Sequence, residues 1–178
     1  MQEFLEDVFL TREDIAKTVK RLGKEITEDY KGKNLLLVSI LKGSVMFMVD
    51  LMKEINLDNC EIDFMYVSSY VGTKNSCGKV NVVRDLNTDI KDYDVLIVED
   101  ILESGYTLHH VKNMLMLRQP KSLKICTFFD KPQSRKVPIE ADYVGREIPD
   151  KFVIGYGMDY NEKYRNLPFV GILDSKYK

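Results

Sequence analysis

Two adjacent acids, Glu99 and Asp100, directly follow an unbroken apolar run at residues 95–98. Such a run is typical of a strand buried on both faces of a parallel sheet. Residues 103–107 then form a turn with glycine and hydroxyl residues, which leads into a segment with helical spacing. Ligands bind beyond the carboxyl ends of parallel strands, and a glycine turn at a helix N-terminus offers N–H groups and a positive dipole. This order of features indicates a phosphate-binding site.

The two acids restrict the ligand further, because carboxylates repel a bare phosphate. Successive strand residues point to opposite faces, so at most one of the acids faces a given ligand edge unless the chain twists. A phosphorylated ribose with magnesium fits the pattern. The carboxylates would accept hydrogen bonds from the ribose hydroxyl groups or hold the hydrated ion, while the turn would hold the 5-phosphate.

The rest of the chain predicts the strands and helices that position these residues. Apolar spacing predicts a helix over residues 11–29, which begins with Thr11 as the N-cap and Asp14 as the capping-box acid, and Leu10 packs on Ile15 as a hydrophobic staple. Further expected elements are a helix at residues 45–55 and strands at residues 35–40, 61–67, 80–84, 122–129, 143–148 and 152–156.

Composition narrows the class of protein. The 178 residues are 44% hydrophobic, which is enough for the core of one domain over residues 1–178. A net charge of −2 provides no basic surface for nucleic acid, and no apolar run approaches the roughly 20 residues of a membrane span. Cys60, Cys77 and Cys126 are widely spaced and odd in number, which predicts reduced thiols in a cytoplasmic protein.

Several short motifs occur in the order of one known family. Residues 98–108, V-E-D-I-L-E-S-G-Y-T-L, resemble the phosphoribosyl pyrophosphate (PRPP) signature of type I phosphoribosyltransferases, in details that look like the hypoxanthine-guanine branch. One such motif is weak evidence, whereas several at compatible spacing are strong evidence. The others, which extend the resemblance over nearly the whole chain, are Leu41-Lys42-Gly43, Ser69-Tyr70, Asp130-Lys131-Pro132 and D-K-F-V-I-G-Y-G-M-D-Y-N-E-K-Y-R-N-L-P at residues 150–168.

The resemblance implies both a fold and an activity. The fold is α/β, with a mainly parallel central sheet flanked by helices and a small hood built from the chain ends. The activity is that of a magnesium-dependent transferase of purine salvage, which moves a 5-phosphoribosyl group from PRPP to N9 of hypoxanthine or guanine and gives IMP or GMP plus pyrophosphate. A homodimer or a homotetramer is implied as well.

The resemblance also implies a role for each matching residue. Glu103 would be the catalytic residue that carries the purine proton, while Glu99 and Asp100 would bind the ribose hydroxyls and the metal. The further implied roles are 5-phosphate binding by Glu103, Ser104, Gly105, Tyr106 and Thr107, pyrophosphate binding by Lys42, Gly43 and Arg165, purine binding by Lys131, Phe152, Val153 and Asp159, a place for Asp159 near the metal, and a lid that begins at Ser69 and Tyr70.

Most of these residues also have an ordinary structural explanation. Lys131 could be a surface lysine, Phe152 a core residue, Asp159 a turn acid and Arg165 a salt-bridge partner. Residues 68–79 could be an exposed hairpin loop. Burial and contacts in the fold distinguish these explanations from a role in binding.

Position 103 departs from the family pattern, in which the third acid of the signature is usually aspartate. Glu103 keeps the carboxylate but adds a methylene, in a site where a displacement of about 1 Å can be costly. Two alternatives to a hypoxanthine-guanine enzyme stay open. One is a non-catalytic regulator that senses PRPP or nucleotides on the same fold, and the other is a relative that prefers xanthine or a pyrimidine.

Overall fold

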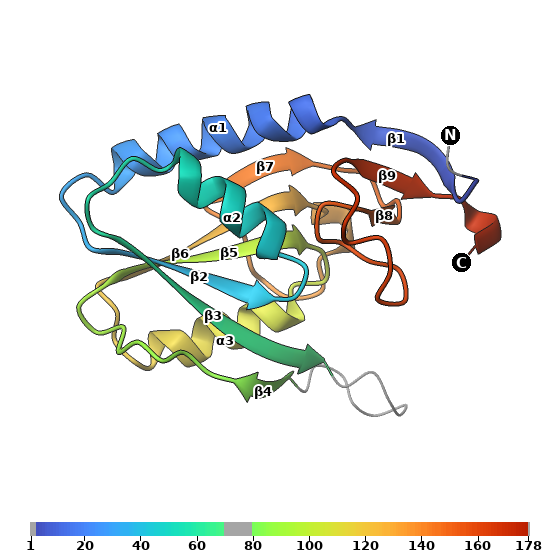
Figure 1. The fold of residues 1–178 in the computed structure, drawn as a ribbon. Coiled ribbons are helices and arrows are strands. Elements are labelled where there is room, and N and C mark those ends of the chain that lie inside the picture. Colours follow the sequence, from blue (N-terminus) through green and yellow to red (C-terminus); the bar gives the residue numbers. More distant parts are fainter. Residues whose placement is uncertain (1–2, 70–79, 178) are drawn as a thin grey trace.

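The computed structural model of the protein describes residues 3–69 and 80–177. Within these residues, six strands form a central sheet in the order β4-β3-β2-β5-β6-β7 (Figure 1). All neighbouring pairs are parallel except β3 and β4 at one edge, which are antiparallel. The mainly parallel sheet is thus confirmed. Its strands are β2 (Leu35–Leu41), β3 (Cys60–Ser69), β4 (Val80–Arg84), β5 (Asp94–Leu102), β6 (Ser122–Asp130) and β7 (Tyr143–Glu147).

Helices cover both faces of this sheet. Figure 1 shows α1 and α2 on one face and α3 on the other. None of the helices in the described ranges is both long and apolar enough to cross a membrane. The helices are α1 (Arg12–Asp29), α2 (Val45–Glu54) and α3 (Tyr106–Met116).

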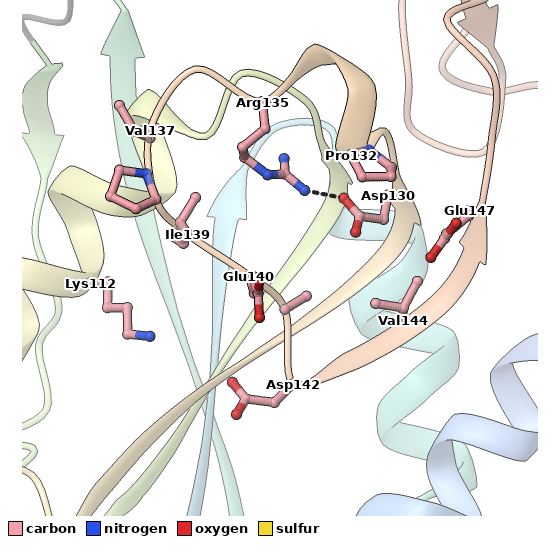
Figure 2. Close-up of a pocket in the computed structure, with 12 residues that line it drawn as sticks. Lys112, Asp130, Pro132, Arg135, Val137, Ile139, Glu140, Asp142, Val144 and Glu147 are labelled. Carbon is pink, nitrogen blue, oxygen red and sulfur yellow. Dashed lines mark hydrogen bonds and ion pairs between the residues drawn. The ribbon is translucent and has the colours of Figure 1, made fainter.

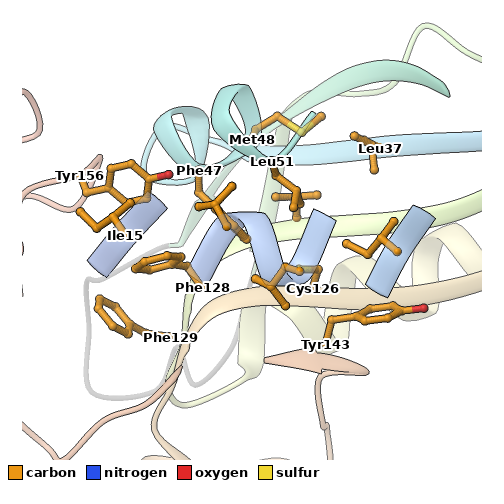
Figure 3. Close-up of a cluster of buried hydrophobic side chains, with 14 of the residues drawn as sticks. Ile15, Leu37, Phe47, Met48, Leu51, Cys126, Phe128, Phe129, Tyr143 and Tyr156 are labelled. Carbon is orange, nitrogen blue, oxygen red and sulfur yellow. The ribbon is translucent and has the colours of Figure 1, made fainter. Parts of the chain in front are cut away.

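Two layers of apolar side chains hold the helices on the sheet. Leu37 of β2 lies in the layer beneath α1 and α2, whereas its neighbour Leu36 lies in the layer beneath α3. In the first layer, the rings of Phe47 from α2 and Phe128 from β6 lie 5.2 Å apart, with Leu37 in the same cluster (Figure 3). Burial on both sides explains why the central strands are continuous apolar runs.

The start of α1 agrees with the sequence expectation. The Thr11 hydroxyl accepts the Asp14 backbone N–H at 3.2 Å, and the Asp14 carboxylate accepts the Thr11 backbone N–H at 3.2 Å. This confirms the capping box, which satisfies donors that a helix end otherwise leaves open. The helix then buries the predicted stripe of Ile15, Val19, Leu22 and Ile26.

Segments from the two chain ends build a second sheet. In the described part of the chain it has three antiparallel strands in the order β1-β9-β8, beside the carboxyl ends of the central strands (Figure 1). This confirms the predicted hood. Its elements are β1 (Leu5–Leu10), β8 (Val153–Ile154) and β9 (Val170–Leu173), followed by the short helix η2 (Ser175–Tyr177).

Two strands differ in length from the sequence expectation. The apolar run predicts that β5 stops before its acids, but the strand continues through them to Leu102, because it keeps pairing with β6. The strand expected at residues 152–156 comprises only Val153–Ile154. It stops there because residues 155–158 close a tight turn, in which the Gly155 N–H donates to the Met158 carbonyl at 3.0 Å.

Asp63 of β3 fixes the chain that follows β4. Its carboxylate accepts backbone N–H groups from Phe64, Asn87 and Thr88 at 2.8, 2.9 and 3.0 Å. Burial by itself raises the pKa of Asp63, but these hydrogen bonds outweigh burial and leave the pKa below its usual value. The ionised carboxylate therefore stabilises the fold above the unfolded-state pKa, and this stabilisation is lost as the pH falls through the folded-state pKa.

We expect Asp63→Asn to lower the free energy of unfolding near pH 7 by about 1–3 kcal/mol, because an amide nitrogen would replace an acceptor of N–H groups. The loss should shrink as the pH falls below about 4, because the unfolded chain then begins to bind a proton at Asp63 and the stabilisation by the ionised carboxylate decreases. Urea unfolding at pH 7 and pH 3.5 measures both values. The matched control is Asp89→Asn, at an exposed carboxylate that accepts one N–H from Lys91 at 3.2 Å. An equal loss at both pH values would contradict the prediction.

Candidate active site

The turn after β2 touches the acids of β5 at the carboxyl edge of the sheet. β2 and β5 are parallel neighbours, so their ends lie side by side. A Cβ added to Gly43 would lie 1.9 Å from Oδ2 of Asp100, far inside contact distance. A side chain at position 43 would therefore displace the Asp100 carboxylate from its place against the turn. The peptide bond between Leu41 and Lys42 is cis.

Glu99 and Asp100 form a half-buried pair of carboxyl groups. Burial raises the pKa of Glu99 well above its usual value, and the neighbouring Asp100 raises it further. Burial also raises the pKa of Asp100. Oε2 of Glu99 is buried and has no hydrogen-bond partner within residues 3–69 and 80–177. A cation or hydroxyl donors would satisfy this oxygen and stabilise both charges, as the sequence prediction requires.

The acid pair alone does not make a complete metal site. Across the described residues, no group of three or more His, Cys, Asp or Glu side chains could hold a metal ion. Mg²⁺ usually keeps several waters and is held by one or two carboxylates together with substrate phosphates. Glu99 and Asp100 fit an ion of this kind, whose remaining ligands would be water and phosphate oxygens.

Residues 103–107 connect β5 to α3. Gly105 is the N-cap of α3 and has a φ of +84°, in the left-handed region that favours glycine. The first N–H groups of a helix have no partner within the helix and carry the positive end of its dipole. Ser104 and Thr107 are half-buried beside them. The turn therefore has the backbone geometry that the predicted phosphate site needs.

Lys131 and Glu103 lie together at the ends of β6 and β5. The Lys131 side chain is only 5% exposed, and its Nζ lies 3.1 Å from Oε1 of Glu103 and 3.7 Å from Oδ1 of Asp150. A lysine this deeply buried is not the surface lysine that the sequence allowed. An ammonium group and a carboxylate side by side present a hydrogen-bond donor and a proton acceptor to one edge of a ligand.

Lys42 and Arg165 meet on a third residue, Glu162. Lys42 Nζ lies 3.1 Å and Arg165 Nη2 lies 3.3 Å from Oε2 of Glu162. Arg165 also donates to the Gly157 carbonyl at 2.8 Å, and its Nε is buried without a partner within the described residues. The structure thus gathers the two cationic residues of the predicted pyrophosphate site, Lys42 and Arg165, around one carboxylate.

Comparison with known proteins decides the family. The model of the phosphoribosyl transferase domain matches residues 7–161. The chain belongs to this family. A curated hypoxanthine-guanine phosphoribosyltransferase of Staphylococcus aureus is 53% identical over 173 residues, which cover 97% of this chain and 96% of the relative. A protein of the same name from Staphylococcus epidermidis is 52% identical over 176 residues, covering 99% and 98%. The crystal structure of a hypoxanthine phosphoribosyltransferase from Staphylococcus aureus has a TM-score of 0.95 at 52% identity, covering 99% of this chain and 96% of that one.

The remaining predicted residues of this phosphoribosyl transferase domain lie in or near the hood. Phe152 precedes β8 and is 39% exposed, with its ring 5.7 Å from that of Tyr160. Val153 is buried in β8 and pairs with Ile172 of β9. Phe152 is therefore not a fully buried core residue, and part of its ring surface is open to a ligand.

Asp159 is placed differently from the acid pair. Its Oδ1 lies 2.9 Å from Nη2 of Arg165, and its Oδ2 accepts the Glu162 backbone N–H at 2.8 Å. No third acid is thus gathered with Glu99 and Asp100 in the described chain, and a role of Asp159 near a metal stays a prediction. Of the two lid residues, Ser69 ends β3, and Tyr70 lies outside the described residues.

Sequence reasoning missed three charged residues that contact the candidate site. Glu162 joins Lys42 to Arg165, Asp150 faces Lys131, and Arg135 donates to the carbonyl of Glu103. No local signal distinguishes them, because each acts on a residue far away along the chain. Asp150 and Glu162 were marked only by their positions inside the motif at residues 150–168, and Arg135 lies outside every motif.

A cavity of about 850 Å³ borders the segment after β6, which packs on the turn at residues 103–107, the phosphate turn (Figure 2). Its lining includes Arg135 and Ile139, which pack next to Gly105, together with Lys112 of α3 and Glu147 of β7. The cavity holds none of the sequence-predicted site residues. It is therefore separate from the candidate active site.

Proposed function

We propose that this member of the phosphoribosyl transferase domain family transfers a 5-phosphoribosyl group from PRPP to N9 of hypoxanthine or guanine, in purine salvage, with magnesium. The observation that carries the proposal is the contact between buried Lys131 and Glu103 beside the phosphate turn. A 6-oxopurine presents its O6 and N7 atoms on one edge. Lys131 donates a hydrogen bond to O6, and Glu103 holds the proton at N7. The names of the Staphylococcus relatives support this substrate class.

Lys131 selects against adenine in this proposal. An ammonium group has three hydrogen-bond donors and no acceptor. Hypoxanthine and guanine offer it an oxygen, whereas adenine offers an amino group that leaves the buried donor unpaired. Such a mismatch costs about 1–3 kcal/mol. The exposed part of the Phe152 ring, which belongs to the motif at residues 150–168, would stack on the purine.

The two ends of PRPP fit the two sides of the site. The N–H groups of residues 104–107 and the hydroxyls of Ser104 and Thr107 hold the 5-phosphate. Lys42 and Arg165, which share the Glu162 carboxylate in this structure, hold the pyrophosphate instead when PRPP binds. The turn at Gly43, which touches Asp100, places pyrophosphate next to the acid pair.

Charge development explains why acids surround the ribose. As N9 of the purine forms its bond to C1 of the ribose, the bond from C1 to the pyrophosphate oxygen breaks, and positive charge develops on the sugar ring. The carboxylates of Glu99 and Asp100 stabilise this charge and accept hydrogen bonds from the 2- and 3-hydroxyls. Bound magnesium would neutralise part of the charge on the leaving pyrophosphate. Glu103 takes up the proton that the purine loses.

The proposal includes a homodimer or homotetramer in the cytoplasm. Met46, Val49 and Met52 recur every three residues on α2 and are 41%, 40% and 38% exposed. An apolar stripe of this kind supports a contact with a second copy of the chain. Cys60 and Cys126 are free thiols, which is compatible with a reducing compartment.

A steady-state assay with PRPP and magnesium tests the reaction, with hypoxanthine, guanine, xanthine, adenine and uracil offered separately. We expect turnover with hypoxanthine and guanine, which disappears when a chelator removes magnesium. Adenine and uracil should give little or no product, because neither places an acceptor opposite Lys131 at the required position. Absence of turnover with every base, while GMP still binds, would refute the enzyme and leave a nucleotide-sensing regulator.

A further inference from the structure

Arg135 joins the phosphate turn to the end of β6. It follows the short helix η1 (Pro132–Ser134), and its Nη2 forms an ion pair with Oδ1 of Asp130 (Figure 2). Its Nη1 donates to the backbone carbonyl of Glu103 at 2.5 Å. The side chains of Arg135 and Asp130 are only 15% and 13% exposed. One planar guanidinium group thus connects a carboxylate at the end of β6 to the main chain after β5.

The chain after Arg135 makes further contacts with the same turn. The Lys136 backbone N–H donates to the Ser104 carbonyl at 3.0 Å. A Cβ added to Gly105 would lie 2.5 Å from Cγ2 of Ile139 and 3.2 Å from Cδ of Arg135. Residues 135–139 therefore pack directly against the turn and hold two consecutive carbonyl groups on the side away from the candidate phosphate site.

We propose that Arg135 is a positioning residue for the 5-phosphate, an inference that rests on the proposed function. A peptide group has its N–H and its carbonyl on opposite sides, so a fixed carbonyl direction also fixes the direction of the next N–H. By holding the Glu103 carbonyl, Arg135 directs the following N–H groups toward the phosphate. A rotated peptide would instead present a carbonyl oxygen to the phosphate and repel it.

The ion pair with Asp130 indicates that Arg135 acts through this geometry more than through its charge. Asp130 neutralises the guanidinium locally and orients its planar fork, so that the second nitrogen faces the Glu103 carbonyl. A lysine at position 135 would keep the charge but has a single ammonium group without the fork. It would reach one of the two acceptors, and the turn would be held less firmly.

The test compares Arg135→Ala and Arg135→Lys with the same substitutions at Arg21. Arg21 is a matched control, because its guanidinium also joins a carboxylate, Glu25, to backbone carbonyls, those of Val144 and Gly145, at 2.8–3.0 Å. We expect Arg135→Ala to raise the KM for PRPP about tenfold or more, with an unchanged KM for hypoxanthine. Arg135→Lys should give an intermediate rise, and both Arg21 variants should leave both KM values unchanged.

Two further measurements separate positioning from simple loss of structure. Thermal unfolding shows whether each variant is folded, and calorimetric titration with ribose 5-phosphate reports phosphate binding without the reaction. The Kd for ribose 5-phosphate should rise about tenfold or more in Arg135→Ala and stay unchanged in Arg21→Ala. If Arg135→Ala does not fold, the contrast between Arg135→Lys and Arg21→Lys decides.

The outcomes distinguish this inference from the proposed function. The role of Arg135 would be overturned, with the reaction intact, if the Arg135 variants had the same KM for PRPP and the same Kd for ribose 5-phosphate as the natural protein. A parallel rise in the KM for PRPP and for hypoxanthine would overturn it as well, because it indicates a general disturbance. A natural protein that binds ribose 5-phosphate in an Arg135-dependent manner, but turns over no base, would refute the reaction and support the positioning role. Absence of both binding and turnover would refute both.

Discussion

Lys131→Met is expected to raise the KM for hypoxanthine by about one to two orders of magnitude, because methionine keeps the length and apolar stem of lysine but cannot donate to O6. A hydrogen bond from a charged donor contributes about 1.5–3 kcal/mol, which corresponds to this range. The KM for PRPP should change much less, since Lys131 contacts Glu103 and Asp150 and is not part of the turn that holds the phosphate. Steady-state kinetics with each substrate varied separately measures the difference.

The same variant should lose discrimination between bases. Without the buried ammonium group, adenine no longer leaves a donor unpaired, so the ratio of kcat/KM for hypoxanthine to that for adenine should fall. Lys151→Met is the matched control, because Lys151 also lies in a family motif, the one at residues 150–168, but is exposed and pairs with Glu6 at 3.2 Å. If Lys131→Met left the KM for hypoxanthine unchanged, another residue would have to recognise O6.

The elements that carry the candidate site could be predicted because their signals are local. The Thr11 and Asp14 capping box, the apolar runs of β2 and β5, and the glycine of the phosphate turn each lie within a few residues of chain. In a parallel sheet, neighbouring strands end at the same edge, so motifs that follow separate strands come together without any long-range information. This is why Gly43 and Asp100, at the ends of β2 and β5, could be assigned to one site.

The contacts among charged side chains could not be predicted in the same way. Lys42 pairs with Glu162, which lies 120 positions away, and Arg135 reaches a carbonyl 32 positions away. Such pairs depend on how the hood and the segment after β6 approach the sheet, and an exposed pair contributes too little energy to restrict the sequence strongly. The burial of Lys131 could not be predicted either, because the sequence also allowed a surface lysine at this position.

The sequence and the structure each contribute separate information about the acid at position 103. The sequence shows a glutamate where the family usually has aspartate, and the structure shows its carboxylate 3.1 Å from the Lys131 ammonium group. A longer side chain therefore still reaches Lys131. Substitution of Glu103 measures how well its carboxylate is aligned with N7 of the purine.

Glu103→Gln is expected to lower kcat by about 10²–10⁴-fold, because an amide cannot take up the purine proton, and proton transfer by a positioned side chain contributes an effect of this size. Glu103→Asp keeps the carboxylate and gives the side chain the length that is usual in the family. We expect it to raise kcat, by less than the roughly hundredfold effect that a displacement of 1 Å can have. The KM for PRPP should change little in either variant, since the backbone of residues 104–107 binds the phosphate.

Asp150→Asn is the matched control for these variants. Asp150 is the second carboxylate near Lys131, at 3.7 Å, but its side chain is 70% exposed and no proton transfer is assigned to it. Its substitution should change kcat less than about threefold, as is usual for an exposed ion pair worth under 1 kcal/mol. If Glu103→Gln and Asp150→Asn had equal effects, the carboxylates would serve only to hold Lys131, and the proton acceptor would have to lie elsewhere. If Glu103→Asp were slower than the natural chain, the extra methylene would be matched to this site and would not impair it.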